Sequence, residues 1–373
     1  MSFSLQSYLD ELRPLIDLDC GTLTKSGIEK VATILSEKYQ QLGWTIKRID
    51  LGDAGCGLEI RNKPEAENID VMLIGHMDTV FPEGTAAERP MTVTGDRAYG
   101  PGVSDMKSGL LTIIYALRQL DHHVLDKLSL CVCMNPDEEI GSIYSSKWLA
   151  SVAKQSTNVL VAEAARADGS LVKARKGMAH YELNFTGKAA HAGNEPENGR
   201  SAISEMANWI VAIDQMTNFE SGTTFNVGIV SGGSGANVVA NHAKAIVDVR
   251  FWDNNEYAEA DKKLLSLTKK PFIDGVTTTA ERVAHKPAMV PSTDTESLMK
   301  LVEQAGEETG VKVAWQAVGG GSDANNTAAL GIPSLDGFGP IGGAFHSTDE
   351  YLELSSIEPR ICLLKQVLTK LAH

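Results

Sequence analysis

Hydrophobic positions over the first half of the chain predict helices and buried strands in alternation. Ile28, Val31, Leu35 and Tyr39 recur at helical spacing. Residues 128–134 instead form a continuous apolar run, which is typical of a strand buried on both faces of a sheet. Further helices are predicted over 4–16, 26–42, 110–120 and 145–152, and further strands over 45–49, 58–61, 70–75 and 158–162. This alternation predicts an α/β fold with a layered, mostly parallel sheet.

Past Gly177 the pattern changes to the order βαββαβ, which is typical of a ferredoxin-like α+β sandwich. Its predicted elements are a strand over 179–185, a helix over 200–215, strands over 223–230 and 243–251, a helix over 256–267 and a strand over 277–284. The first pattern then resumes, with helices over 295–309 and 356–371 and a strand over 311–315. We therefore predict one domain formed by residues 1–177 and 287–373, interrupted by an inserted domain over 178–286.

The amino-acid composition excludes some classes of binding partner. The chain has 373 residues, of which 43% are hydrophobic and 22% charged, and a formal net charge of −14. This acidity disfavours binding to nucleic acids and to anionic membrane surfaces. The five scattered cysteines argue against a disulfide framework. We find neither a secretory leader nor a membrane-spanning apolar run, so a cytoplasmic location is the default expectation.

Two adjacent acidic residues, Glu138 and Glu139, directly follow the predicted strand 128–134. Neighbouring like charges repel, so their presence in a groove favours a bound cation. Other acidic and histidine residues also lie at predicted strand ends or in glycine-containing turns. These residues are His76, Asp78, Asp105, Glu163 and His346. Together they predict a two-metal hydrolase site, although each motif alone has an ordinary structural explanation, such as a turn aspartate or a solvated helix start.

The chemistry assigns a role to each side chain. Two divalent cations about 3.5–4 Å apart polarise a carbonyl and activate water when a carboxylate bridges them. Asp78 would orient the imidazole of His76 from behind. Glu138 would act as general base, taking a proton from the attacking water and passing it to the leaving amine. The metal ligands would be His76, Asp105, Glu139, Glu163 and His346.

The segments GHMDTV, YGPGVSDMKSG, PDEEIGS, GKAAHAG and GGGSDANN resemble the signatures of the dizinc aminoacylase/carboxypeptidase family of metallopeptidases. Within that family the chain is most similar to bacterial glutamate carboxypeptidases of the carboxypeptidase G type. The resemblance implies a zinc-peptidase-like three-layer catalytic domain and a homodimer formed through the inserted domain, which would also act as a lid. It also implies two Zn²⁺ ions per subunit, with Co²⁺ or Mn²⁺ as substitutes.

The same resemblance implies how the ligands divide between the two ions. His76 and Glu163 would hold the first ion, Glu139 and His346 the second, and Asp105 would bridge them. It further implies a cis peptide bond between Asp105 and Met106.

Four further features of the resemblance concern the substrate. His191 is similar to the family histidine that reaches into the active site of its own or of the neighbouring subunit and stabilises the oxyanion. Arg250 and Asn237 resemble the family's contacts to the free carboxylate of the substrate, for which a guanidinium fork is well suited. Gly320 and Gly321 would present backbone N–H groups to the same carboxylate.

The sequence thus predicts a zinc-dependent metallopeptidase or amidohydrolase. It would release an amino acid from the C-terminus of a small peptide or from an N-acyl amino acid. Glutamate is a candidate for that amino acid, but Lys286 stands where glutamate-specific relatives often have arginine, so this preference stays open. The alternatives are an N-acyl amino acid deacylase, a dipeptidase or a desuccinylase on the same scaffold. Outside the class, the alternative is a metal-binding protein without turnover, against which the retained Glu138 argues.

Overall fold

The computed structural model describes residues 3–373, which divide into two compact units. The first comprises the chain up to Ala174, Pro291–Val318 and Ser322–His373, and the second comprises Arg175–Val290 and Gly319–Gly321. The boundaries expected from the sequence lie a few residues from these. The structure differs in grouping the short glycine segment 319–321 with the second unit.

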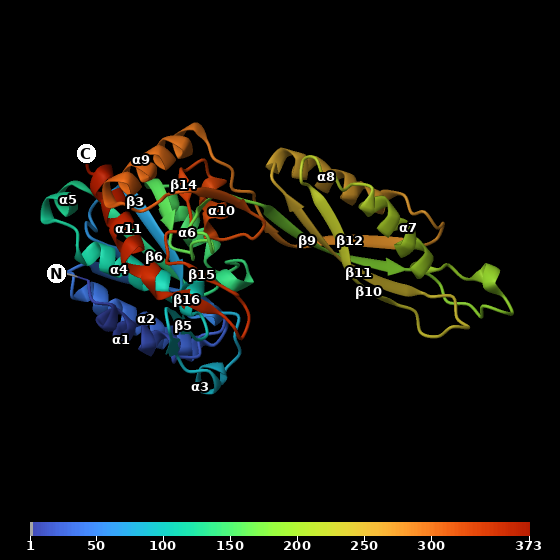
Figure 1. Ribbon diagram of the computed structural model, residues 1–373. Coiled ribbons are helices and arrows are strands. Elements are labelled where there is room, and N and C mark those ends of the chain that lie inside the picture. Colours follow the sequence, from blue (N-terminus) through green and yellow to red (C-terminus); the bar gives the residue numbers. More distant parts are fainter. Residues whose placement is uncertain (1–2) are drawn as a thin grey trace. The chain divides into compact units, whose positions relative to one another are not determined.

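The first unit is built around a six-stranded sheet with the order β1-β2-β6-β3-β7-β14 (Figure 1). Strand β3 pairs in parallel with β6 and β7, and β14 pairs in parallel with β7. Only β1 and β2, at one edge, run antiparallel to their neighbours. The strands are β1 (Thr45–Asp50), β2 (Cys56–Arg61), β3 (Ile69–His76), β6 (Leu130–Asn135), β7 (Ser156–Val161) and β14 (Ser334–Leu335). The predicted α/β class with a mostly parallel sheet is confirmed.

Helices cover both faces of this sheet, as two glycines demonstrate. A Cβ atom on Gly75 would meet Leu110 of α4, whereas one on Gly57 would meet Trp148 of α6. Gly75 is paired with Met134, and Met134 with Leu58, so these three residues face the same side of the sheet. Gly57 precedes Leu58, and successive residues of a strand face opposite sides. The two glycines therefore lie on opposite faces. Helix α11 packs against α4 and α9 (Figure 1). The helices are α1 (Leu5–Ile16), α2 (Lys25–Gln40), α3 (Thr85–Glu88), α4 (Ser108–Arg118), α5 (His122–Lys127), α6 (Ser146–Ala153), α9 (Thr293–Thr309), α10 (Asp323–Ala328) and α11 (Ile357–Leu371).

Short strands form two smaller sheets that the hydrophobic pattern did not predict. One has the order β15-β16-β5-β4, and β13 pairs with β8 in the other. These strands are β4 (Thr92–Thr94), β5 (Arg97–Tyr99), β8 (Leu171–Arg175), β13 (Trp315–Val318), β15 (Gly342–Gly343) and β16 (Tyr351–Glu353). The strand predicted over 311–315 is wrong, because Val311 and Val313 pack back onto Gly306 of α9 and the strand begins only at Trp315.

The second unit has the predicted element order βαββαβ. Its four-stranded antiparallel sheet has the order β10-β11-β9-β12, and α7 and α8 pack on one face (Figure 1). Alternate residues of β9, from Ala179 to Phe185, are buried with Trp209 of α7 in a separate core. The elements are β9 (Gly177–Thr186), α7 (Ala202–Asp214), β10 (Thr224–Gly232), β11 (His242–Phe251), α8 (Asn254–Ser266) and β12 (Thr277–Lys286).

All five cysteines are free thiols, and four of them are buried. Cys131 and Cys133 lie in the fully buried strand β6, where burial raises the pKa of the Cys133 thiol well above its usual value. They therefore contribute to the core as small apolar side chains. Across residues 3–373, every helix is too short or too polar to span a bilayer.

The carboxylate of Glu11 ties three helices of the first unit together. It accepts hydrogen bonds from Lys38 of α2 at 2.5 Å, from Arg118 of α4 at 2.8 Å and from the Tyr115 hydroxyl at 2.9 Å. Burial alone would raise the pKa of Glu11, but the bonds from Arg118 and Lys38 outweigh it and hold the pKa below its ordinary value. A carboxylate with a lowered pKa in the folded state stabilises the fold above its unfolded pKa, and this contribution is lost as the pH falls.

We expect Glu11→Gln to lower the free energy of unfolding at pH 7 by about 1–2 kcal/mol, because the ion pairs are partly exposed and screened. Denaturant unfolding should show this loss shrinking as the pH falls below about 4, where the parent carboxylate is protonated as well. The exposed Glu37→Gln on α2 is the control and should have little effect. A loss for Glu11→Gln that is equal at pH 7 and at acidic pH would contradict the role of its charge.

Candidate metal centre

Three strand ends bring the acidic cluster together. Strand β3 ends at His76, β6 is followed by Glu138 and Glu139, and β7 ends two residues before Glu163. Since β3 runs parallel to both β6 and β7, the carboxyl ends of all three strands lie at one edge of the sheet. The convergence therefore follows from the parallel pairing of these strands.

Two loops supply the remaining predicted ligands. Asp105 lies in the loop before α4, and His346 lies between β15 and β16. The peptide bond between Asp105 and Met106 is cis, in agreement with the resemblance. His346 has a φ of 61°, a left-handed backbone conformation that directs its side chain from the middle of a tight turn.

The carboxylate of Asp105 lies between two imidazoles. Its Oδ1 is 3.1 Å from Nε2 of His76, and its Oδ2 is 3.2 Å from Nε2 of His346. Each imidazole faces a second carboxylate as well. Nε2 of His76 is 3.5 Å from Oε1 of Glu163, and Nε2 of His346 is 3.2 Å from Oε2 of Glu139. The five side chains thus form two groups that share Asp105, with one of its carboxylate oxygens toward each group.

Asp78 organises the centre from behind. Nδ1 of His76 is 3.0 Å from the Asp78 carbonyl oxygen and 3.3 Å from its Oδ1, so Nε2 points toward the other ligands. The Asp78 carboxylate also accepts the backbone N–H groups of Glu138 and Glu139, each at 3.2 Å, and the Thr22 hydroxyl at 2.5 Å. It therefore orients both the first imidazole and the turn that carries the two glutamates. Thr22 carries no sequence motif, and only the fold reveals its contact.

The charges of the centre depend on one another. Burial would lower the pKa of His76, but Glu163, Asp105 and Asp78 raise it well above its usual value. Hydrogen bonds to Asp105 and Glu139 raise the pKa of His346 to about 10. Burial would raise the pKa of Asp105, but the two imidazoles hold it well below its ordinary range.

The remaining carboxylates lack sufficient compensating charge. Burial raises the pKa of Glu139 and, more strongly, that of Glu163. The cluster therefore has to bind either protons or cations to be stable. Imidazole nitrogens and carboxylate oxygens are the ligands that Zn²⁺ accepts in proteins. Ligand atoms of His76, Asp105 and Glu139 lie within 4.8 Å of one another, and so do those of His76, Glu138 and Glu163. The two sets share His76, and each is compact enough to hold a divalent cation.

Glu138 lies beside this ligand set. One of its carboxylate oxygens is within 4.8 Å of the ligand atoms of His76 and Glu163. The side chain is partly buried, and its backbone N–H is held by Asp78.

The second unit contains the other predicted residues. His191 is exposed, and its Nδ1 accepts the backbone N–H groups of Gly193 and Asn194, both at 3.1 Å. Nδ1 therefore acts as an acceptor, so a ring proton is carried by Nε2. Asn237 lies beside this segment, because its carbonyl oxygen accepts the N–H of Ala192 at 2.9 Å.

Arg250 and the glycine segment also lie in the second unit. Nε of Arg250 donates to both carboxylate oxygens of Asp248, at 3.1 and 3.0 Å. Its two terminal amino groups have no partner within residues 3–373. Gly320 and Gly321 are exposed, and the Gly320 carbonyl oxygen accepts a hydrogen bond from Arg175 at 3.0 Å.

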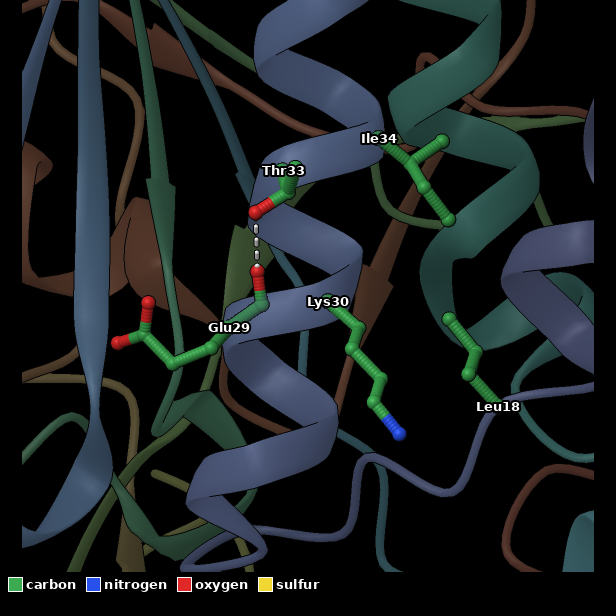
Figure 2. A pocket seen from close by; sticks show the side chains of 5 residues that line it. All are labelled: Leu18, Glu29, Lys30, Thr33 and Ile34. Atoms are coloured by element: carbon green, nitrogen blue, oxygen red, sulfur yellow. Dashed lines mark hydrogen bonds between the residues drawn. The ribbon is translucent and has the colours of Figure 1, made fainter.

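A hollow of about 430 Å³ on α2 is a different kind of feature (Figure 2). It is lined by Leu18, Glu29, Lys30, Thr33 and Ile34. The Thr33 hydroxyl donates to the Glu29 carbonyl oxygen within the helix at 2.8 Å, and the charged ends of Glu29 and Lys30 point away from each other (Figure 2). The hollow therefore lacks the convergent charges found at the strand ends.

Comparison with known proteins decides the family. The sequence model of peptidase family M20/M25/M40 matches residues 72–370, a range that includes every residue of the acidic cluster. The chain belongs to this family. An M20 peptidase is a metal-dependent hydrolase of peptide or amide bonds, so the protein is an enzyme of that class.

Individual relatives cover nearly the whole M20 chain. It is 30% identical to carboxypeptidase G2 of Pseudomonas sp. (strain RS-16), over 96% of this chain and 88% of that protein. It is 26% identical to acetylornithine deacetylase of Edwardsiella ictaluri, over 95% of this chain and 94% of that protein. Among solved structures, aminopeptidase PepT from Bacillus cereus matches with a TM-score of 0.79 and 22% identity, covering 99% of both chains. An M20 family metallo-carboxypeptidase from Sulfolobus solfataricus matches with a TM-score of 0.73 and 18% identity, covering 98% of this chain and 99% of that one.

Asp105→Asn tests whether one carboxylate serves two ions. An amide offers a single ligating oxygen, so we expect the variant to hold fewer zinc ions per chain than the parent after equilibrium dialysis, as counted by elemental analysis. The control is Asp121→Asn, an exposed position before α5, which should keep the parent count. If Asp105→Asn holds as many zinc ions per chain as the parent, a carboxylate at position 105 is not needed to bind them.

Proposed function

We propose that this M20 enzyme is a two-zinc hydrolase that releases an amino acid with a free carboxylate from a small peptide or an N-acyl amino acid. The observation that carries the proposal is the position of Asp105, with one carboxylate oxygen facing His76 and the other facing His346. In this arrangement His76 and Glu163 would hold one ion, and His346 and Glu139 would hold the other. When bound, the two cations polarise the substrate carbonyl and lower the pKa of water.

Glu138 is the general base and acid in this proposal. Its proximity to the ligand atoms of His76 and Glu163 supports the role, because a base has to lie next to the water that it deprotonates. The carboxylate takes a proton from the attacking water and delivers it to the amide nitrogen that leaves. Asp78 supports the reaction by holding the Glu138 backbone and by fixing the ring of His76.

The second unit supplies the groups that recognise the substrate. The Nε2–H of His191 is suited to donate to the oxyanion as the carbonyl is attacked. Asp248 engages only the Nε edge of Arg250, which leaves the terminal fork for the substrate carboxylate. Asn237, Gly320 and Gly321 provide further hydrogen bonds to that carboxylate.

The relatives support the shared part of this activity. A carboxypeptidase, acetylornithine deacetylases and succinyl-diaminopimelate desuccinylases all match the chain over most of its length. The carboxypeptidase has the higher identity, so we favour release of a C-terminal amino acid, with glutamate as a candidate. Deacylation of an N-acyl amino acid is the second candidate function.

Two further proposals concern assembly and location. Strand β10 is at the edge of its sheet and exposes Ile229 and Val230 by 65% and 52%, which supports a homodimer through the inserted domain. The five free cysteines support a reducing, cytoplasmic compartment.

Glu138→Ala should separate catalysis from metal binding. We expect the variant to bind zinc as the parent does and to turn over at least about a hundredfold more slowly, because the proton carrier is lost. The matched variant Glu139→Ala should lose activity together with zinc. Hydrolysis by Glu138→Ala at the parent rate would rule out the role of Glu138.

Arg250→Lys tests recognition of the carboxylate. We expect KM to rise about 10- to 100-fold for substrates with a free carboxylate, because the lysine lacks the two-pronged donor geometry. KM for the corresponding carboxamides should change little. The control Arg282→Lys, on β12 of the same sheet, should match the parent in steady-state kinetics. An equal change for acids and amides would contradict carboxylate binding by Arg250.

A further inference from the structure

A buried carboxylate lies beneath the loop that carries Asp105. Glu350 is 1% exposed. Its Oε2 accepts the backbone N–H of Gly102 at 3.0 Å, and its Oε1 accepts those of Ser104 and Asp105 at 2.9 and 3.0 Å. None of its bonds runs to the ligand atoms of the acidic cluster, so Glu350 acts on the backbone of the loop.

The loop needs a partner of this kind. Gly102 adopts a left-handed conformation with φ of 73°, and Asp105 has non-helical dihedral angles, φ −111° and ψ 91°. The N–H groups of 102, 104 and 105 lie at the start of a distorted π-helical turn, Val103–Lys107, where the first N–H groups have no partner within the turn. Leaving buried donors unpaired is unfavourable. The two oxygens of a carboxylate have enough lone pairs to accept all three converging donors. A glutamine of the same size offers a single oxygen and places an NH₂ group against an N–H.

Glu350 also links the two loops that supply facing ligands. It follows His346 by four residues, and Nε2 of His346 is 3.2 Å from Oδ2 of Asp105. A side chain from the His346 segment thus holds the backbone of the Asp105 segment. Movement of either loop would separate the two oxygens of Asp105 from one or both imidazoles.

We propose that Glu350 is a positioning residue that fixes the carboxylate of Asp105 at the place where it bridges two zinc ions. The proposal rests on the two-zinc function above. It differs from a purely structural role, in which Glu350 would stabilise the fold without affecting metal affinity. Partners that orient metal ligands typically contribute 10- to 100-fold in affinity or activity, whereas stability alone would change only the unfolding temperature.

Glu350→Gln and Glu350→Asp test the proposal, with the exposed neighbour Asp349→Asn as control. The full chain is stripped of metal, its unfolding temperature is measured, and zinc affinity is determined by competition with a chromophoric chelator. We expect about 10- to 100-fold weaker zinc binding for Glu350→Gln at one or both sites. The shorter Glu350→Asp keeps the charge but reaches fewer N–H groups, so we expect an intermediate loss. Should Glu350→Gln not fold, the loss in Glu350→Asp decides the question.

Parent-like zinc affinity in the folded Glu350 variants would overturn the proposal, even if their metal-free unfolding temperatures fall. If the parent chain binds two zinc ions and the Glu350 variants bind zinc with the same affinity, only the role of Glu350 is ruled out. A parent chain that binds no zinc would remove the proposed two-zinc function and this inference with it. Asp349→Asn should match the parent in both measurements.

Discussion

At the carboxyl edge of the sheet, three carboxylates lie against two imidazoles and need additional positive charge. The structure around this cluster depends on that requirement. Asp105, Glu139 and Glu163 all lie within 3.5 Å of an imidazole nitrogen, and burial raises the pKa of both glutamates. Repulsion between such groups would favour their separation if they served the fold alone. The sheet, which supplies Glu139 and Glu163, and the segment before α4, which supplies Asp105, nevertheless bring these groups together. This is unfavourable without bound cations or protons. The cluster is therefore best understood as a preformed site for cations.

Two buried carboxylates accept hydrogen bonds from the backbone around this cluster. Asp78 accepts the N–H groups of the Glu138–Glu139 turn, and Glu350 accepts those of the Asp105 loop. Each provides oxygens to N–H groups at the start of a short helical turn, where these donors have no partner within the turn. The candidate metal ligands thus lie on segments whose backbone is bound by acidic residues outside the candidate ligand set. The second unit has its own core and contains His191 and Arg250.

Much of this arrangement was predictable from the sequence because buried parallel strands have a strong apolar signal. The run over residues 128–134 located the Glu138–Glu139 turn, and the strands ending near His76 and Glu163 followed from the same reasoning. Asp105 and His346 lie in loops, so only their motifs and the family resemblance indicated their place. The strand at Trp315–Val318 was misplaced because the apolar residues before it pack on a helix. Thr22 and Glu350 could not be predicted, since their contacts join segments far apart along the chain.

The most direct test of the account is anomalous diffraction at the zinc absorption edge from crystals of the zinc-loaded protein. We predict two peaks about 3.5–4 Å apart, on either side of the Asp105 carboxylate, one near His76 and the other near His346. A single peak, or zinc bound elsewhere on the chain, would contradict the claim that this cluster is built for two ions.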